Sequence, residues 1–204
     1  MYTAIAGTSL TLAQYIRQNL EADFNLKLLF SPLNGGTMVV SLSTPEEMTE
    51  NALEGLSVWL YRIVRDDERL NDPPPRLGRG QSRKTPLPLR LHYLVTPTVA
   101  NTNPTGSETE QTIMGKVLQV LYDHPTLSGA DLQGDLSGTH LQLTARLESM
   151  SLEDITKVWY ALERSYELSV SYEVTVVYID SELSESVSPV KVVLTEPGLI
   201  VSTS

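Results

Sequence analysis

The sequence predicts an α+β domain in which about three helices flank a mainly antiparallel sheet. Three observations support this class. Strand-like segments cluster along the chain and do not alternate strictly with helices. The helical segments carry apolar residues at helical spacing, and the clearest strand segments alternate between apolar and polar residues. A segment of about twenty residues, far longer than a hairpin needs, joins two of the predicted strands. No internal repeat is present.

We predict three main helices, each with an amphipathic pattern. They lie over residues 10–22, 108–123 and 151–163. In the first helix, Leu12, Ile16 and Leu20 share one face. Ser9 and Ser151 are the expected N-caps of the first and third helices. A shorter helical turn is expected after Thr44, because a proline and two glutamates follow that residue.

The predicted strands lie over residues 26–32, 38–43, 56–64, 86–96, 141–148 and 166–179, with one more short strand after residue 188. Segment 56–64 is apolar on both faces, which indicates an interior position, with Ile63 on the face of Trp59. Pro88 lacks an N–H and is expected at a strand start or a sheet edge. In segment 166–179, Ser169 and Ser171 are expected to face outward.

Length and composition limit the function classes. A chain of 204 residues suits one domain, or one domain with a tail. The absence of cysteine excludes disulfides, iron–sulfur clusters and a cysteine nucleophile, and fits a reducing compartment. The net charge of -10 argues against a nucleic-acid coat. We expect no signal peptide and no insertion into a membrane, because no basic leader and no long apolar run are present.

Positive charge is concentrated between Arg62 and Arg90. This window holds eight basic and four acidic residues, whereas the remainder holds seven basic and 21 acidic residues. No acid occurs from Pro73 to Leu91. One interpretation is a solvated loop whose arginines maintain solubility. The other is an electrostatic contact with carboxylates or phosphates on a partner.

The second interpretation predicts a partner interface in and beside this long basic inter-strand loop. Its expected members are Arg62, Arg65, Arg69, Asn71, Arg76, Arg79, Arg83, Lys84 and Arg90.

A search for catalytic, cofactor and metal sites finds none. His92, His124 and His140 have no ligand partner at metal-binding spacing, so we expect no metal site. The phosphate-loop, hydrolase and metalloprotease motifs are absent. Trp59 and Trp159 have apolar neighbours and are expected in the core. We therefore expect a protein that is not an enzyme and that uses no cofactor.

Four segments together resemble the cap, or tail-terminator, proteins of phage-tail-like contractile injection systems. They are VWLYRIVRDDERLNDPPP, PLPLRLHYLVTP, MGKVLQVLYDHPTLSG and SLEDITKVWYALERSYELSVSYEVTVVYIDS. The resemblance is to the amino-terminal domain of those proteins and covers about residues 3–181. The matching positions are Arg62, Asn71, His92, Tyr93, Trp159, Tyr172 and Glu173.

The resemblance implies a tail-terminator-like fold and a structural role. Such proteins form a ring, six-fold by analogy, that closes the inner tube and holds the last sheath layer away from the baseplate. The implied partners are other copies of the chain, the tube protein and the sheath protein, without a small-molecule substrate. Assembly is expected in the bacterial cytoplasm, on a particle that is then released or membrane-anchored.

Two further expectations complete this reading. The terminator-like domain is expected over residues 1–181, with a linker and an extension over 182–204. The competing function is a nucleic-acid-binding accessory protein that uses the basic loop 76–90. No aromatic residue lies between Pro73 and His92, so a stacking platform for bases is missing there.

Overall fold

The computed structural model describes residues 2–70, 76–78, 81–100, 103–181 and 184–186. The α-helices are α1 (Ala4–Ala22), α2 (Lys27–Phe30), α3 (Pro45–Glu50), α4 (Gly106–Asp123) and α5 (Leu152–Ala161). The strands are β1 (Val39–Ser41), β2 (Gly55–Arg65), β3 (Arg76–Gly78), β4 (Gln81–Arg83), β5 (Leu87–Thr98), β6 (Thr126–Ser128), β7 (Gln142–Leu147), β8 (Val170–Ile179) and β9 (Ser184–Ser186).

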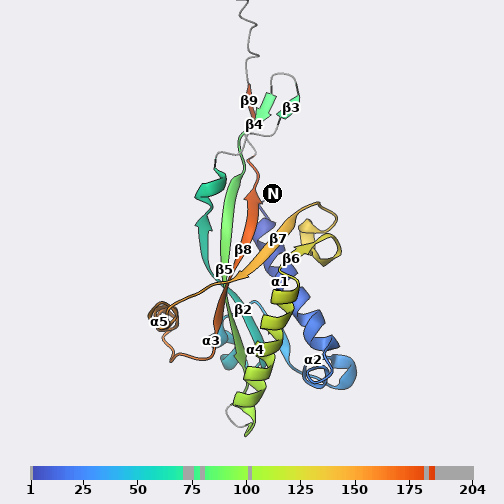
Figure 1. Ribbon diagram of the computed structural model, residues 1–204, viewed down its shortest axis with the longest axis vertical. Coiled ribbons are helices and arrows are strands. Elements are labelled where there is room, and N and C mark those ends of the chain that lie inside the picture. Colours follow the sequence, from blue (N-terminus) through green and yellow to red (C-terminus); the bar gives the residue numbers. More distant parts are fainter. Residues whose placement is uncertain (1, 71–75, 79–80, 101–102, 182–183, 187–204) are drawn as a thin grey trace, which may run out of the picture.

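The main sheet has six strands in the order β1-β2-β5-β8-β7-β6. All neighbouring pairs are antiparallel except β1 and β2, which are parallel. The prediction of an α+β fold with a mainly antiparallel sheet is therefore confirmed. The three predicted long helices correspond to α1, α4 and α5, the short turn predicted after Thr44 corresponds to α3, and α2 is an additional helix. In Figure 1, α1 and α4 lie on one side of the sheet and α5 on the other.

The larger core lies between the sheet and helices α1 and α4. Strand β5 presents Leu91, Tyr93 and Val95 to this core, and all three are fully buried. The hydroxyl of Tyr93 lies 2.8 Å from the Oγ atom of Ser9 on α1. Burial raises the pKa of Tyr93, so this phenol stays neutral and joins strand to helix by a hydrogen bond.

The first helix begins earlier than predicted. Helix α1 starts at Ala4, so the expected N-cap at Ser9 is wrong: its hydroxyl instead bonds Ile5 O and the Tyr93 hydroxyl. Thr8 and Thr11 are also buried in the helix and bond the carbonyls four residues before them. Hydroxyl residues that normally favour helix ends are satisfied inside this helix, because each finds a backbone acceptor.

The segment predicted as a strand over 26–32 is helical, which corrects that prediction. The Asp23 carboxylate accepts hydrogen bonds from the backbone N–H groups of Asn25 and Leu26, and this starts a turn. Helix α2 then places Phe30 four residues after Leu26, and both side chains are buried. The predicted turn after Thr44 is confirmed as α3, whose first turn has a full capping box.

A smaller core lies on the other face of the sheet, beneath α5. Trp159 is fully buried there against Leu94 and Ile155, which confirms its predicted core position. Its indole N–H donates to Ser169 Oγ at 2.9 Å. Ser169 and Ser171 were expected to face solvent, and that expectation is wrong. Both are buried, because Ser169 accepts the bond from Trp159 of α5 and Ser171 bonds Glu148 and Tyr61.

A β-bulge changes the faces of β2. The register with β5 shifts between Leu60 and Arg62, so Tyr61 is the extra residue. Ile63 is therefore paired with Leu91 and lies on the opposite face from the predicted one. The interior position of β2 is confirmed, since it lies between β1 and β5. Pro88 is the second residue of β5, at the predicted strand start.

The basic loop has regular structure of its own. Strands β3, β4 and β9 form a second sheet in that order, which extends beyond the end of the main sheet (Figure 1). The pairing of Leu87 with Ile179 in the main sheet is continued by the pairing of Arg83 with Ser184. Strand β9 lies inside the segment predicted as linker and extension, residues 182–204. The domain boundary at residue 181 stays a prediction, and the strand predicted after residue 188 lies outside the described residues.

Within the described part of the chain, no helix combines the length and apolar composition that crossing a membrane requires.

The start of β2 generates a stability prediction. Gly55 has φ of +136°, and a Cβ atom there would lie 2.1 Å from Val39 O on β1. We expect Gly55→Ala to lower the free energy of unfolding by at least about 1–3 kcal/mol, because of backbone strain alone. Urea unfolding measures this change. The control is Gly115→Ala on α4, where no atom lies within 4 Å, and we expect it to raise stability by about 0.5–1 kcal/mol. Equal effects at both positions would contradict the prediction.

Candidate partner-binding surface

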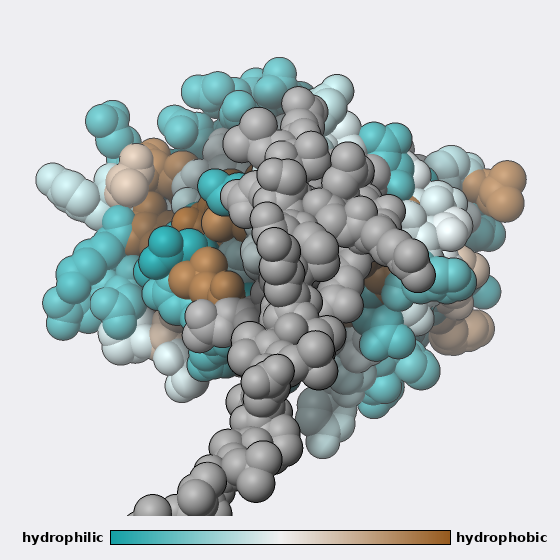
Figure 2. Space-filling model, turned by 90° about the horizontal axis from the view of Figure 1, so that it is seen from above, coloured by the Kyte–Doolittle hydropathy of each residue, from teal (hydrophilic) through white to brown (hydrophobic). Residues whose placement is uncertain are grey.

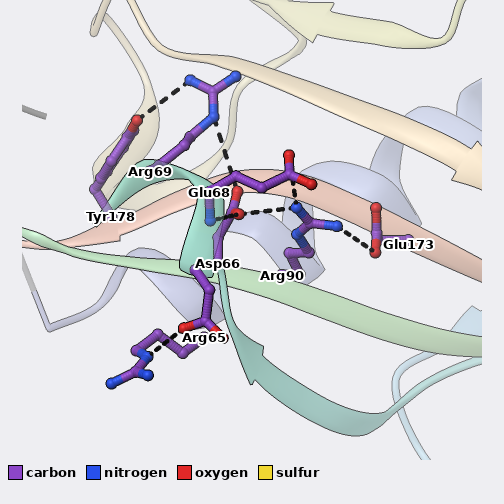
Figure 3. Close-up of polar contacts among 8 residues, drawn as sticks. Arg65, Asp66, Glu68, Arg69, Arg90, Glu173 and Tyr178 are labelled. Atoms are coloured by element: carbon purple, nitrogen blue, oxygen red, sulfur yellow. Dashed lines mark hydrogen bonds and ion pairs between the residues drawn. The ribbon is translucent and has the colours of Figure 1, made fainter. Parts of the chain in front are cut away.

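The basic loop is anchored by a buried carboxylate at its first residue. The Asp66 side chain is only 3% exposed. It accepts a hydrogen bond from Arg90 Nη2 at 2.8 Å and one from the backbone N–H of Glu68 at 3.2 Å (Figure 3). The backbone N–H of Asp66 donates to Pro88 O at 2.9 Å, which keeps the loop entrance on β5. These bonds fix the direction in which the chain leaves the sheet.

Arg90 is the centre of this cluster. Its guanidinium lies 2.8 Å from Asp66, 3.2 Å from Glu68 and 3.7 Å from Glu173. The hydrogen bond from Arg90 lowers the pKa of Asp66, although burial opposes this shift. The same bond raises the pKa of Arg90. The cluster therefore holds both groups in their charged forms and ties the loop entrance to β5 and β8.

Two more arginines of the predicted interface are paired within the chain. Arg65 lies 2.7 Å from Asp67, and Arg69 lies 3.8 Å from Asp66 with a second contact to the Tyr178 hydroxyl at 3.5 Å (Figure 3). Together with Arg90, these arginines have their charge balanced by nearby acids. Their first role in this structure is to hold the loop entrance, and their role toward a partner stays a prediction.

The remaining predicted interface residues divide into two groups. Arg62 and Lys84 are exposed, and neither forms an ion pair with another residue that the structure describes. Asn71 and Arg79 lie outside the described residues. Arg76 lies in β3 and Arg83 in β4, where the structure describes the course of the backbone alone. Arg62 and Lys84 are thus the described cations of the predicted interface that are available to a partner.

The sheet brings polar residues together in a way that sequence spacing did not indicate. His92 Nδ1 lies 3.0 Å from Glu148 Oε1, although 56 residues separate them in the chain. The Ser171 hydroxyl donates to the other oxygen of Glu148 and contacts the Tyr61 hydroxyl at 3.0 Å. Alternation in β5 and β8 placed His92 and Ser171 on one face, but it gave no sign of Glu148, which follows β7.

This polar network also contains a potential metal-ligand set. Ligand atoms of His92, Glu148 and Glu173 all lie within 4.8 Å of one another. Arg90 lies 3.7 Å from Glu173, and Ser171 donates a hydrogen bond to Glu148, so both carboxylates already have partners within the chain. The absence of a metal site stays a prediction. Ser171 donates its proton to a carboxylate and not to the imidazole, so these side chains do not form a nucleophile–base pair.

The strand register aligns four charged or polar side chains across the sheet. Arg62 pairs with His92, His92 with Glu173, and Glu173 with Arg146, so all four lie on the same face. Like Arg62, Arg146 is exposed and forms no ion pair with another described residue. Seen from the loop end, the described surface is mainly hydrophilic with separate hydrophobic clusters (Figure 2).

The Asp66 cluster generates a pH prediction. Because the folded pKa of Asp66 is lowered, its ionised form stabilises the protein above about pH 4, and this contribution is lost as the pH falls through the folded pKa. We expect Asp66→Asn to lower the free energy of unfolding at pH 7 by about 1.5–3 kcal/mol. It should also reduce the loss of stability between pH 5 and pH 3. Chemical unfolding at each pH provides the measurement.

The control is Asp67→Asn, because the Asp67 side chain is 71% exposed and pairs only at the surface. We expect this variant to match the wild type within about 0.5 kcal/mol. If Asp66→Asn and Asp67→Asn had the same pH profile, Asp66 would not be the anchor.

Comparisons with known proteins identify the family. No curated protein sequence matches the chain. The solved PVC sheath/tube terminator of an extracellular contractile injection system is similar in fold, with a TM-score of 0.60 and 19% identity. The match covers 98% of this chain and 65% of that chain. The anti-feeding prophage cap gives a TM-score of 0.47 and 20% identity over 88% of this chain and 62% of that chain.

The predicted tail-terminator-like fold is confirmed by the first of these structures. Residues 7–192 match the family described as the Pvc16 N-terminal domain. This match extends over most of the sequence and includes the basic loop. The chain belongs to the Pvc16 N-terminal domain family.

Proposed function

We propose that this chain is a structural cap of a contractile injection system. It closes the inner tube and holds the last layer of the sheath at the end away from the baseplate. Family membership over residues 7–192 is the observation that carries the proposal. The fold likeness to a solved sheath/tube terminator over 98% of the chain supports it.

The partners of this cap are other copies of the chain, the inner tube and the sheath. By analogy the copies form a six-fold ring, whose heterologous contacts close on themselves. The chain spans 65% of the length of the solved PVC terminator. We therefore propose these partners for the chain and do not infer them from that structure alone. Assembly takes place in the bacterial cytoplasm, and the cap then remains in the finished particle.

The anchored basic loop supports a docking role. Its entrance is fixed by the Asp66–Arg90 pair, while Arg62 and Lys84 remain exposed and unpaired among the described residues. A positive surface of this kind steers and orients an acidic partner. Several such contacts around a ring act together, so each contact can be weak.

The role is mechanical and not catalytic. Contraction of the sheath pulls on its terminal layer, and the cap keeps tube and sheath joined there. The competing nucleic-acid function has less support. In the loop 76–90, Arg90 is already paired with Asp66 and Glu68, and no aromatic residue lies between Pro73 and His92 to stack on bases.

Removing this chain during particle assembly tests the proposed function. We expect tubes of variable length and sheaths that detach at the distal end, because nothing stops further addition of subunits there. Electron microscopy of purified particles measures both properties. Restoring the chain from a plasmid should restore uniform length. Particles of normal length that retain their sheath without this chain would contradict the proposal.

The basic loop gives a second prediction. We expect the triple variant Arg79→Glu, Arg83→Glu and Lys84→Glu to fold normally and to impair capping, because the docking charge is reversed. Its matched control is Arg17→Glu, Lys27→Glu and Lys157→Glu, which changes net charge equally on α1, α2 and α5. The measurements are circular dichroism, particle length and sheath retention. Normal capping by the loop variant would remove the loop from the interface.

A further inference from the structure

The end of the molecule opposite the basic loop contains an acidic groove. The groove has a volume of about 360 Å³ and lies where α3, the start of α4 and the segment between α5 and β8 meet. Its charged lining residues are Glu54, Glu110, Glu167 and Arg164. Arg164 pairs with Glu167 at 3.3 Å, which leaves two negative charges in excess.

Two of these glutamates keep one carboxylate oxygen available. Glu54 Oε1 accepts the backbone N–H of Ala100 at 2.8 Å, and Glu110 Oε1 accepts that of Val99 at 3.3 Å. No residue in the described part of the chain bonds the second oxygen of either side chain. Burial raises the pKa of Glu110, and the nearby charge of Glu167 adds to this shift. The groove therefore concentrates negative charge that a cationic side chain would stabilise.

The complementary charge of this molecule lies at the other end of β5. The loop enters β5 at Leu87 and the groove lies beside Thr98, so the strand separates them by roughly 36 Å. Figure 1 shows the small sheet β3-β4-β9 at the opposite end of the molecule from α3 and the start of α4, the elements beside the groove. Exposed Lys84 cannot reach Glu167 of its own chain. A contact between the two surfaces must therefore join two molecules.

We propose that the acidic groove of one copy receives the basic loop of a second copy. Charge complementarity selects this occupant, since the loop is free of acids from Pro73 to Leu91 and the groove has the opposite sign. Because the two surfaces lie at opposite ends, the contact is heterologous and joins copies head to tail. The inference rests on the proposed ring and names the surfaces that close it.

Cross-linking in assembled particles tests this contact, because the natural chain has no cysteine. The variant Lys84→Cys/Glu167→Cys places one thiol at the loop and one at the groove. Arg79 and Arg83 keep the loop positive, and Glu54 and Glu110 against Arg164 leave one negative charge in excess in the groove. A short bifunctional maleimide should give a ladder of covalent multimers of this chain. Lys84→Cys/Glu21→Cys is the matched control and should give no ladder.

A charge variant makes the test specific. Adding Glu54→Gln and Glu110→Gln removes two charges but keeps an amide oxygen to accept the N–H groups of Ala100 and Val99. We expect about tenfold less cross-linking with an unchanged circular dichroism spectrum. Mixing the two single-cysteine variants should give dimers only, because each copy then offers one reactive surface.

If particles that contain the cap gave only the uncross-linked monomer of this chain, this inference would be overturned and the proposed function would stand. Cross-links to tube or sheath protein alone would also overturn it, because the occupant of the groove would then be a different chain. If particles never contained this chain, the proposed function itself would be wrong. Electron microscopy of the particles decides that question separately from the cross-linking.

Discussion

The ion pair between Asp66 and Arg90 is the interaction on which the arrangement of the loop depends. A carboxylate that is only 3% exposed remains ionised here because a guanidinium lies 2.8 Å away. Arg90 also contacts acids on the loop and on β8, so three separate segments meet at one cation. Removing Arg90 would leave the Asp66 carboxylate buried without its nearest cation, which costs far more than the loss of a surface pair. The loop therefore leaves the sheet in one fixed direction.

The central strands connect this loop to the rest of the molecule. Strand β5 carries the apolar residues of the main core on one face and Arg90 and His92 on the other. The same strand runs from the loop end to the acidic groove. A molecule with opposite charges at the two ends of a stiff sheet is suited to repeated head-to-tail contact. Closure of such contacts into a ring gives an assembly that accepts no further copies, which is the property that a cap requires.

Sequence reasoning succeeded where periodicity determines structure. The capping signal at Thr44, the amphipathic pattern around Trp159 and the alternation of β5 each depend on neighbouring residues. It failed where distant contacts override local preference. Ser9 looked like a helix start, yet it lies inside α1, where its hydroxyl bonds the Ile5 carbonyl and the Tyr93 hydroxyl. The bulge at Tyr61 reversed the face of Ile63, and no local signal marks it. For the site, positive charge was found in advance, but its acidic partners Asp66 and Glu173 were not.

A cryo-electron microscopy reconstruction of the distal end of an intact particle tests the central claim most directly. Our account predicts a closed ring of this chain on the last layer of tube and sheath, with the loop end of each copy against its neighbour. A distal end that lacks this chain, or a position for it at the baseplate, would contradict the account.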